Sequence, residues 1–324
     1  MTASAKQCCV ACEGVHRVAP FIAVERLLGT LEPFEYWECP DCGCVQIARV
    51  PEDLARHYPA RYFAFKAQHR LARNRLRGWL DPLRVDAALG RGGVLGRAAN
   101  LVLKPLDYVA WCQLTGLDRE ARVLDIGCGT GKLLVRLRQG GFRRCLGIDP
   151  YLREPLRYAN GAEVRKQSVF ELAASSKERF ELVMAHHSLE HMTRPHEVLA
   201  AAARLMAPHG WMLVRVPVAG GYAWRSYREH WFALDPPRHL FLPTRSAMQR
   251  LAARAGLRIE AVRYDGTLQQ FALSEVYRRG LSLDRPHVER RIFSRRQLAR
   301  WREQAEALNA AGDGDQAAFF LRHA

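Results

Sequence analysis

The 324-residue sequence has no run of eighteen apolar residues, which is about the length that a membrane-spanning helix requires. Its first eight residues also lack the apolar stretch of a secretory signal. These two absences argue against a spanning helix and against export, so we expect a cytoplasmic location. Apolar residues still make up 48% of the chain, which is enough for one large α/β domain and a small accessory domain.

Lysine is scarce, although the chain is strongly basic. Only six of the 49 cationic side chains are lysine, and the formal net charge is +16. Such a charge favours nucleic-acid binding, but here it is spread along the chain, and a G+C-rich coding sequence explains the arginine content equally well. We therefore do not expect nucleic acid as a partner. The densest basic segment, residues 66–77, could contact anionic lipid or a phosphate-bearing substrate as an amphipathic helix, or form a solvated helix face.

A glycine-rich stretch that directly follows a short apolar run is the most informative pattern. Residues 123–126 read as a buried strand, and residues 132–139 read as a helix. Between them glycine recurs in a G-x-G-x-G spacing, at Gly127, Gly129 and Gly131. A strand that turns through glycines into a helix brings backbone N–H groups close to a ligand. The spacing lacks the extra residue of the G-x-G-x-x-G loop of dinucleotide-binding dehydrogenases, which are the nearest functional alternative.

An acidic residue follows the next predicted strand, residues 145–148. Asp149 at the tip of that strand can accept hydrogen bonds from a ribose diol. A glycine triplet alone is also found in ordinary turns, and Asp149 is what favours a ligand site over a plain strand–turn–helix connection.

Together these residues resemble motifs I and II of the class I S-adenosylmethionine-dependent methyltransferases. Their motif I is commonly D-x-G-x-G-x-G, which here begins at Asp125. The resemblance implies that Asp125 and the glycine loop hold the aminoacyl part of S-adenosylmethionine and that Asp149 holds its ribose. It places the adenine near Ser168 and Val169, which follow the third predicted strand.

Strands and helices alternate through most of the chain, which predicts an α/β, doubly wound, mostly parallel sheet of seven strands. The remaining predicted strands are residues 162–168, 180–185, 211–216, 257–264 and 316–322. The predicted helices between them include residues 195–206 and 245–255. In the resembled family the last strand inserts antiparallel beside the sixth. We expect a zinc-ribbon-like domain over residues 1–50, a linker and helical segment over 51–118, and a methyltransferase domain over 119–324 with a helical insertion at about 275–312.

Six of the nine cysteines fall within the first 44 residues. Two C-x-x-C pairs, formed by Cys9, Cys12, Cys39 and Cys42, offer four thiolates for a tetrahedral zinc ion. Four thiolates close the coordination sphere, so we expect a structural zinc. Disulfides, or a ribbon that has lost its metal, are the alternatives.

The two cysteine pairs are 26 residues apart, and the intervening segment contains a predicted hairpin with residues 21–25 and 34–38 as strands. Cys8 and Cys44 are additional and could replace one of the four ligands. A ribbon followed by a segment rich in tyrosine and proline, here residues 50–63, and then by a methyltransferase domain resembles bacterial methyltransferases of sugar and polysaccharide pathways.

Candidate catalytic residues follow the fourth predicted strand, because doubly wound sheets bind ligands at the carboxyl ends of their strands. An H-x-L-E-H-x-x-x-P run resembles a run at this place in the family and contains His187, Glu190 and His191. Methyl transfer to a hydroxyl or amine requires removal of a proton, and histidine suits that role. His187 is our first candidate for the general base and His191 the second, with a structural contact as the alternative for His191. Glu190 could hold a histidine tautomer or cap a helix.

A long aromatic and polar segment follows the fifth predicted strand, as is common for acceptor-binding loops. Its end resembles the D-x-P-R-H element of the same methyltransferase subgroup and contains Asp235, Arg238 and His239. Arg238 and Asp235 are candidate substrate-binding residues, since Arg238 could clamp a phosphate or carboxylate. His239 is a further candidate base. The alternative is a structural ion pair between Asp235 and Arg238.

We therefore expect a methyltransferase that uses S-adenosylmethionine and carries a structural Zn²⁺. The expected acceptor is a small molecule or glycan, a sugar hydroxyl or carbon that is nucleotide- or lipid-linked, with peripheral membrane contact as an option. One alternative is an RNA or protein methyltransferase, which the net charge favours and which would bind nucleic acid with steep salt dependence. The other is a non-catalytic scaffold with this fold, which would not bind the cofactor.

Overall fold

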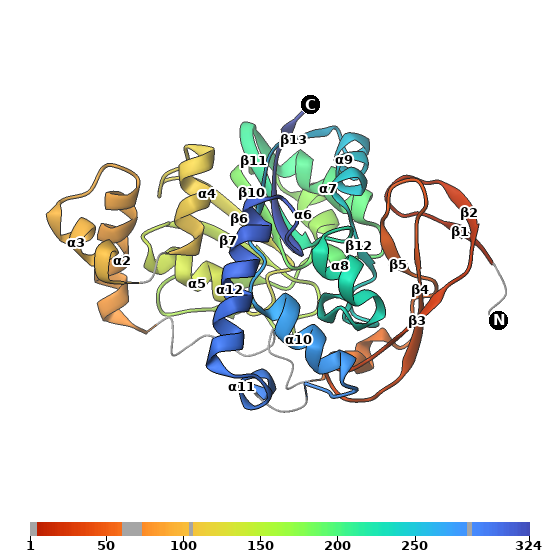
Figure 1. Cartoon of the computed structure of the whole chain (residues 1–324). Helices are drawn as coiled ribbons and strands as arrows, with labels where there is room; N and C mark the ends of the chain where they lie inside the picture. The colour runs from red at the N-terminus through yellow and green to blue at the C-terminus, as the bar shows by residue number, and fades with distance from the viewer. Residues whose placement is uncertain (1–4, 60–72, 104–105, 284–286) are drawn as a thin grey trace.

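The computed structural model describes residues 5–59, 73–103, 106–283 and 287–324. At its centre lies a mixed sheet. Within the described residues this sheet has eight strands, in the order β13-β14-β11-β10-β6-β7-β9-β8 (Figure 1). The strands are β6 (Arg122–Ile126), β7 (Arg144–Ile148), β8 (Leu156–Arg157), β9 (Glu163–Arg165), β10 (Phe180–His186), β11 (Met206–Pro217), β13 (Leu257–Tyr264) and β14 (Gln316–His323).

The strand directions confirm the predicted α/β class. Strands β9, β7, β6, β10 and β11 run parallel, and β14 lies between β11 and β13, antiparallel to both. The seven predicted strands are all present. The eighth strand, β8, lies at the edge of the sheet and pairs antiparallel with β9. It has only two residues, which are too few to show an apolar pattern from which a strand can be predicted.

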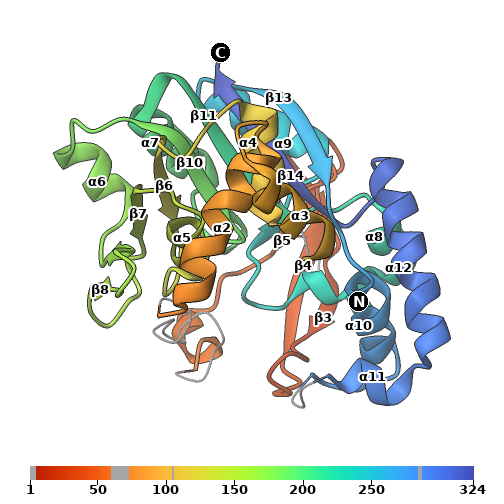
Figure 2. The same cartoon turned by 90° about the vertical axis from the view of Figure 1, so that its left-hand side faces the viewer.

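Helices cover both faces of this sheet (Figures 1 and 2). The helices of the described ranges are α2 (Arg75–Ala88), α3 (Val94–Val102), α4 (Asp107–Thr115), α5 (Lys132–Gln139), α6 (Val169–Ser175), α7 (Pro195–Leu205), α8 (Tyr222–Tyr227), α9 (Arg245–Arg254), α10 (Gln269–Arg278), α11 (Val288–Ile292) and α12 (Arg295–Ala310). No helix in the described part of the chain is long and apolar enough to cross a membrane.

Alternation along the central strands explains the two-faced core, because successive strand side chains point to opposite faces. Leu124 and Ile126 of β6 join a buried cluster with residues of α6, α7 and α9. Val123, whose side chain points to the other face, joins a second cluster with Tyr108 of α4 and Leu137 of α5. The sheet is therefore buried on both sides, as the apolar strand sequences require.

The N-terminal segment forms two small sheets. Strand β1 (Ala5–Cys8) pairs with β2 (Val15–Val18), and β3 (Phe21–Val24) pairs antiparallel with β4 (Pro33–Glu38), which confirms the predicted hairpin. Strand β5 (Val45–Ile47) pairs with β4 on one side and on the other with β12 (Phe241–Leu242). The N-terminal sheet thus gains a strand from a segment almost 200 residues later in the chain.

Two predicted strands differ in length from the observed ones. The third was expected over residues 162–168, but β9 ends at Arg165 because Ser168 begins helix α6 as its N-cap. The fifth was expected to begin at Trp211, whereas β11 begins at Met206, directly after α7, and is irregular before Trp211. Of the predicted basic segment 66–77, residues 66–72 lie outside the described ranges, and α2 begins at Arg75.

Candidate active site

A cavity of about 2500 Å³ opens at the carboxyl ends of the parallel strands. These strands contribute residues that end or follow them: 127–130 of the glycine loop after β6, Asp149 after β7, 167–170 beyond β9, and 186–188, 190 and 191 at the end of β10. This is the edge at which doubly wound sheets bind ligands. The cavity therefore brings together most of the site residues that the sequence indicated.

The glycine loop adopts a backbone that other residues would resist. Gly127, Gly129 and Gly131 have φ of 67°, 54° and 75°, in the left-handed region that favours glycine. A Cβ atom on Gly127 would lie 2.6 Å from Cβ of Ser188, and the Ser188 hydroxyl donates to the carbonyl oxygen of Ile126 (2.7 Å). Glycine thus lets strand β6 and the end of β10 approach closely around the cavity.

We expected the backbone N–H groups of this loop to lie close to a ligand, but those of the three glycines bond within the protein. The N–H of Gly127 donates to the carbonyl of Ile148 (2.8 Å), and that of Gly131 donates to the carbonyl of Cys128 (2.9 Å). The N–H of Gly129 donates to Oδ2 of Asp149 (2.9 Å). These three N–H groups therefore hold the loop in shape rather than facing a ligand, because the tight turn closes them on their own neighbours.

Asp149 is held firmly at the tip of β7. Its Oδ2 accepts from Gly129, and its Oδ1 accepts from the N–H of Tyr151 (2.9 Å). Burial raises the pKa of this carboxyl group above its ordinary value, although the two backbone hydrogen bonds oppose that rise. Each carboxylate oxygen can accept a further hydrogen bond, so the group can bind a diol from inside the cavity.

Asp125 is buried at the end of β6 and lines the same cavity. Burial, and then the nearby charge of Asp149, raise its pKa to about 8. Its Oδ1 has no hydrogen-bond partner among the described residues. A buried carboxyl oxygen without a partner, next to a second carboxyl group, is complementary to a cationic ligand. The two carboxyl groups therefore fit S-adenosylmethionine, which carries an ammonium and a sulfonium group.

Ser168 and Val169 line the cavity beyond β9. The Ser168 hydroxyl is part of a capping box: it accepts from the N–H of Glu171 (3.2 Å) and donates to the Glu171 carboxylate (2.8 Å). The hydroxyl and the N–H of Ser168 are therefore committed to the start of α6, and the Val169 side chain is what this corner offers to a ligand.

Both ring nitrogens of His187 lie close to polar side chains. A guanidinium group can only donate, so Nε2 of His187 accepts from Nη1 of Arg215, and the ring proton is on Nδ1. Nδ1 lies 3.4 Å from Oε1 of the fully buried Glu190. The residue also has a φ of 53°. A neutral ring fixed in this way has no free lone pair with which to take a proton.

In His191 and His239 the nitrogen that is hydrogen-bonded to the protein is Nδ1, whereas in His187 it is Nε2. Nδ1 of His191 donates to the carbonyl oxygen of Arg238 (2.8 Å), and Nδ1 of His239 donates to that of Ala233 (2.6 Å). In the neutral rings both Nε2 atoms therefore carry a free lone pair. Burial, and then the charge of His239, lower the pKa of His191, which keeps its ring neutral near pH 7.

Glu190 completes a cluster with these two rings. One ligand atom from each of Glu190, His191 and His239 lies within 4.8 Å of the others, and the two rings are 4.8 Å apart between centroids. Burial acts to raise the pKa of Glu190, but His187, His191 and His239 together hold it at about 2. The cluster thus places an ionised carboxylate beside two basic nitrogens, an arrangement that can accept a proton and stabilise the resulting imidazolium.

Arg238 and Asp235 form the ion pair that the sequence offered as the alternative to substrate binding. The guanidinium is fully buried, with Nη2 at 2.6 Å from Oδ1 of Asp235 and 2.8 Å from Oε1 of Glu25. Arg238 does not line the cavity, whereas Asp235 and His239 do. The sequence reading missed Glu25, and no local signal identified it, since its partner is 213 residues away.

Tyr58 lines the cavity, and the sequence did not single it out. Its hydroxyl lies 3.1 Å from Nδ1 of His191 and 3.4 Å from the carbonyl oxygen of Arg238. It follows a short 3₁₀ helix, Leu54–His57, in the tyrosine- and proline-rich segment after the N-terminal sheets. That composition was the available signal, and the structure places the described part of the segment, up to residue 59, against the histidine cluster.

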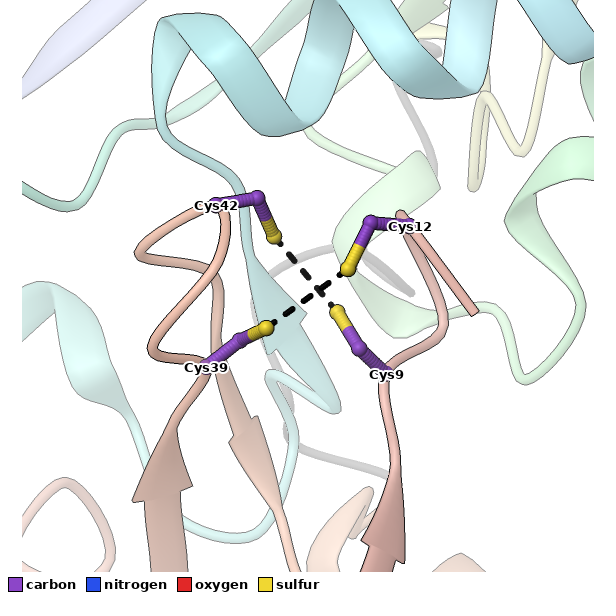
Figure 3. A group of neighbouring side chains, drawn as sticks. All are labelled: Cys9, Cys12, Cys39 and Cys42. Atoms are coloured by element: carbon purple, nitrogen blue, oxygen red, sulfur yellow. Dashed lines mark hydrogen bonds between the residues drawn. The ribbon is translucent and has the colours of Figure 1, made fainter. Parts of the chain in front are cut away.

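The four predicted metal-ligating cysteines meet in one cluster (Figure 3). Sγ of Cys9 is 3.6 Å from Sγ of Cys42, and Sγ of Cys12 is 3.6 Å from Sγ of Cys39. A tetrahedral zinc with Zn–S bonds of about 2.3 Å requires S···S separations of about 3.8 Å, so the donor set fits zinc. Cys8 is exposed and Cys44 is buried beside the cluster, and neither belongs to the group of four.

The cysteine cluster is attached to the large sheet's helices. The Thr244 hydroxyl, at the N-cap of α9, donates to the carbonyl oxygen of Cys42 (2.5 Å). At the other end of α9, Nη1 of Arg254 donates to the carbonyl oxygen of Val10 (3.1 Å). The cluster is therefore a support that orients the N-terminal segment, and it contributes no residue to the cavity.

Known proteins resemble this chain over its central part. The model of a family described as "Methyltransferase domain" matches residues 97–262. A ubiquinone biosynthesis O-methyltransferase of Nitrosospira multiformis is 34% identical over 125 residues, which are 35% of this chain and 52% of that protein. One of Alkalilimnicola ehrlichii is 39% identical over 112 residues, which are 32% of this chain and 44% of that protein. The chain thus spans about half the length of the curated relatives it matches.

Solved structures resemble it more distantly. The [4+2]-cyclase SpnF has a TM-score of 0.41 at 19% identity, covering 76% of this chain and 94% of that chain. A mycolic acid cyclopropane synthase complexed with SAH has a TM-score of 0.40 at 13% identity, covering 66% of this chain and 85% of that chain.

Proposed function

The chain belongs to the methyltransferase domain family, and we propose that it transfers a methyl group from S-adenosylmethionine to a small-molecule acceptor. The observation that carries this proposal is the pair of buried carboxyl groups, Asp125 and Asp149, at the ends of neighbouring strands around the glycine loop. When bound, S-adenosylmethionine supplies an electrophilic methyl group on a positively charged sulfur. Asp125 faces the cationic part of the cofactor, and Asp149 accepts hydrogen bonds from its ribose.

The size of the cavity supports an acceptor that binds beside the cofactor. Its volume of about 2500 Å³ exceeds the roughly 300–1000 Å³ of a typical single-ligand pocket. The curated relatives are named O-methyltransferases, which favours a hydroxyl acceptor. The N-terminal cysteine cluster and the tyrosine- and proline-rich segment after it resemble those of bacterial methyltransferases of sugar and polysaccharide pathways, and this resemblance favours a sugar, nucleotide- or lipid-linked, as the acceptor.

Transfer to a hydroxyl needs a proton acceptor on the acceptor side of the cavity. His191 and His239 have a free Nε2 in their neutral forms, and both belong to the cluster with Glu190. We assign the base to this pair rather than to His187, whose Nε2 accepts a hydrogen bond from Arg215. Glu190 stabilises the imidazolium formed when the proton is taken.

Titration calorimetry of the zinc-loaded protein with S-adenosylmethionine tests the cofactor part of the proposal. Micromolar binding that Asp149→Ala abolishes and Glu306→Ala retains supports it, since Glu306 is an exposed carboxylate on α12 outside the cavity. Absence of binding by the folded wild-type protein, both alone and with candidate acceptors present, contradicts it and favours the non-catalytic scaffold.

The acceptor class is tested by turnover with isotopically labelled methyl donor. Nucleotide-linked hexoses and ortho-dihydroxybenzenes are compared, with bulk RNA and an unrelated protein as further acceptors. Methylation of the sugar nucleotides supports the proposed class. Exclusive methylation of the phenols replaces the sugar with an aromatic acceptor, and exclusive labelling of RNA or protein contradicts a small-molecule acceptor altogether.

A further inference from the structure

An exposed apolar surface lies on helices α2 and α3 and the residue that follows α3. Seven of the fourteen large apolar side chains that are exposed in the described ranges lie between residues 76 and 103. We call them the α2–α3 surface: Leu76, Trp79, Val94, Leu95, Leu101, Val102 and Leu103. The two helices project from the molecule on the side opposite β1–β5 in Figure 1, and Figure 2 turns them toward the viewer.

Helix α3 has a defined inner and outer side. Gly96 is buried, and a Cβ atom on it would lie 2.1 Å from the carbonyl oxygen of Leu83 in α2, so this side packs on α2. At about 3.6 residues per turn, Val94 and Leu101 lie on the opposite side, with Val102 at its edge. These three side chains are 77%, 89% and 85% exposed. The outer side of α3 is therefore an apolar stripe without a described partner.

The charge around this stripe is of one sign. Residues 73–103 contain six arginines and two aspartates. Both aspartates are neutralised within the protein, by Asp81–Arg84 and Asp86–Arg119 ion pairs of 3.1 and 2.7 Å. Four exposed arginines make no ion pair with any residue in the described ranges: Arg73, Arg75, Arg77 and Arg97. The α2–α3 surface thus combines exposed apolar side chains with unpaired positive charge.

We propose that the α2–α3 surface binds the interface of a membrane that contains anionic lipid. Exposed Trp, Leu and Val side chains enter the boundary between headgroups and acyl chains, and arginines beside them pair with lipid phosphates. A second copy of the chain fits less well. A two-fold contact through this face would bring the same arginines of both copies together, and like charges across an interface oppose association.

Vesicle co-sedimentation of the full-length protein tests this proposal. Vesicles of phosphatidylcholine mixed with phosphatidylglycerol are compared with vesicles of phosphatidylcholine alone. We expect binding to the anionic vesicles that weakens with salt, a fall of about tenfold or more in Leu101→Ser/Val102→Ser and a fall of about fivefold in Arg97→Gln. The matched control is Val15→Ser/Ile22→Ser, which removes two exposed apolar side chains (51% and 45%) from β2 and β3 and should bind as the wild type does.

Three outcomes overturn the proposal: no binding to anionic vesicles, equal binding by Leu101→Ser/Val102→Ser, or equal loss in the Val15→Ser/Ile22→Ser control. Light scattering is run in parallel, and a wild-type dimer that becomes a monomer in Leu101→Ser/Val102→Ser assigns the surface to a second copy instead. Cofactor titration and circular dichroism of each variant show that the fold and the cavity are intact. Because those readouts are independent of vesicle binding, failure here is distinguishable from failure of the proposed methyl transfer.

Discussion

At the scale of single residues, burial decides the ionisation of the groups around the cavity. Asp125 and Asp149 both lie at the ends of parallel strands with little access to water, and burial raises the pKa of each. Among the residues that the structure describes, no arginine or lysine acts on the pKa of either carboxyl group in the way that Arg238 lowers that of Asp235. The folded protein therefore keeps two carboxyl groups poised for a cationic ligand.

This arrangement predicts a dependence of stability on pH. The pKa of Asp125 is about 8 in the folded protein and about 3.9 in an unfolded chain. Between these values the folded state binds more protons than the unfolded state, so the free energy of unfolding falls as pH rises. The slope is at most about 1.4 kcal/mol per pH unit for one group. Urea unfolding at pH 5 to 8 should show this fall in the wild type and a flatter profile in Asp125→Asn.

The matched control for this measurement is Asp53→Asn, which alters an exposed carboxylate. Its profile should follow that of the wild type. A profile for Asp125→Asn that is as steep as the wild-type profile would show that Asp125 is ionised in the folded protein without its ligand.

The histidine pair yields a second prediction at this scale. His191→Ala and His239→Ala should each leave S-adenosylmethionine affinity within about threefold, because neither side chain is hydrogen-bonded to the glycine loop, Asp125 or Asp149. The variant that lacks the base should lose about 10²–10⁴ in kcat, the usual contribution of a general base. Steady-state kinetics with the acceptor that the turnover assay identifies measure kcat, and calorimetry measures the cofactor affinity of the same variants.

The control for the pair is His209→Ala, an exposed histidine in β11 outside the cavity. Wild-type kcat in both His191→Ala and His239→Ala would remove the pair from the mechanism and return the role to His187. A loss of cofactor affinity that matches the loss of kcat would instead identify the pair as structural.

At the scale of elements, the N-terminal sheets depend on a cluster of four thiols and on helix α9. The sheets are short, and strands of three to six residues cannot build a large core of their own. Contacts of Cys42 with Thr244 and of Val10 with Arg254 join the cluster to α9. A bound metal ion would hold the ends of both cysteine-bearing turns together.

Metal removal should therefore unfold the N-terminal sheets before the large sheet. We expect the purified protein to contain about one zinc per chain, as measured by elemental analysis. Cys39→Ser should lose most of the metal and lower the midpoint of thermal unfolding, while Cys8→Ser, which alters an exposed thiol outside the cluster, should keep both. Oxidised cysteine pairs in a thiol titration, with no zinc in protein grown with added metal, would favour the disulfide alternative.

At the scale of the whole molecule, one buried guanidinium connects segments that are far apart in sequence. Arg238 pairs with Glu25, which follows β3, and with Asp235 in the loop that also positions His239. Next to it, the Tyr36 hydroxyl donates to the carbonyl oxygen of His239 (2.8 Å). The N-terminal sheet is therefore bound to the same loop that contributes a histidine to the cavity.

Arg238→Gln should be strongly destabilising, because it leaves the carboxylates of Glu25 and Asp235 buried without their cation. Removing one partner of a buried ion pair costs about 3–5 kcal/mol, which urea unfolding can resolve. Arg56→Gln is the matched control, since it breaks the exposed Arg56–Glu32 pair (2.9 Å) of the same region. Exposed pairs contribute about 0–1 kcal/mol. A small loss in Arg238→Gln, similar to that in Arg56→Gln, would contradict a structural role for the buried arginine.

The sequence-based predictions were accurate where the signal lay in a few contiguous residues, and they failed where it depended on distant segments. Strand β6, the glycine turn and helix α5 were predicted within one residue, because their apolar runs and glycines are contiguous. The antiparallel β14 was placed by resemblance. Strand β9 was predicted too long, since the Ser168 capping box uses the residues that read as its end. The participation of Glu25 and Tyr58 could not be predicted, because each meets its partner only across more than 130 residues.

The sequence by itself determined the fold class, the glycine turn with Asp125 and Asp149, and the two cysteine pairs. These features depend on residue type and short spacing, which folding does not alter. Only the tertiary structure decided which histidines keep a free nitrogen, and that Arg238 is consumed by internal carboxylates. A hydrogen-bond partner or an ion pair depends on which distant segments approach and how completely they exclude water, and that information appears only once the chain is folded.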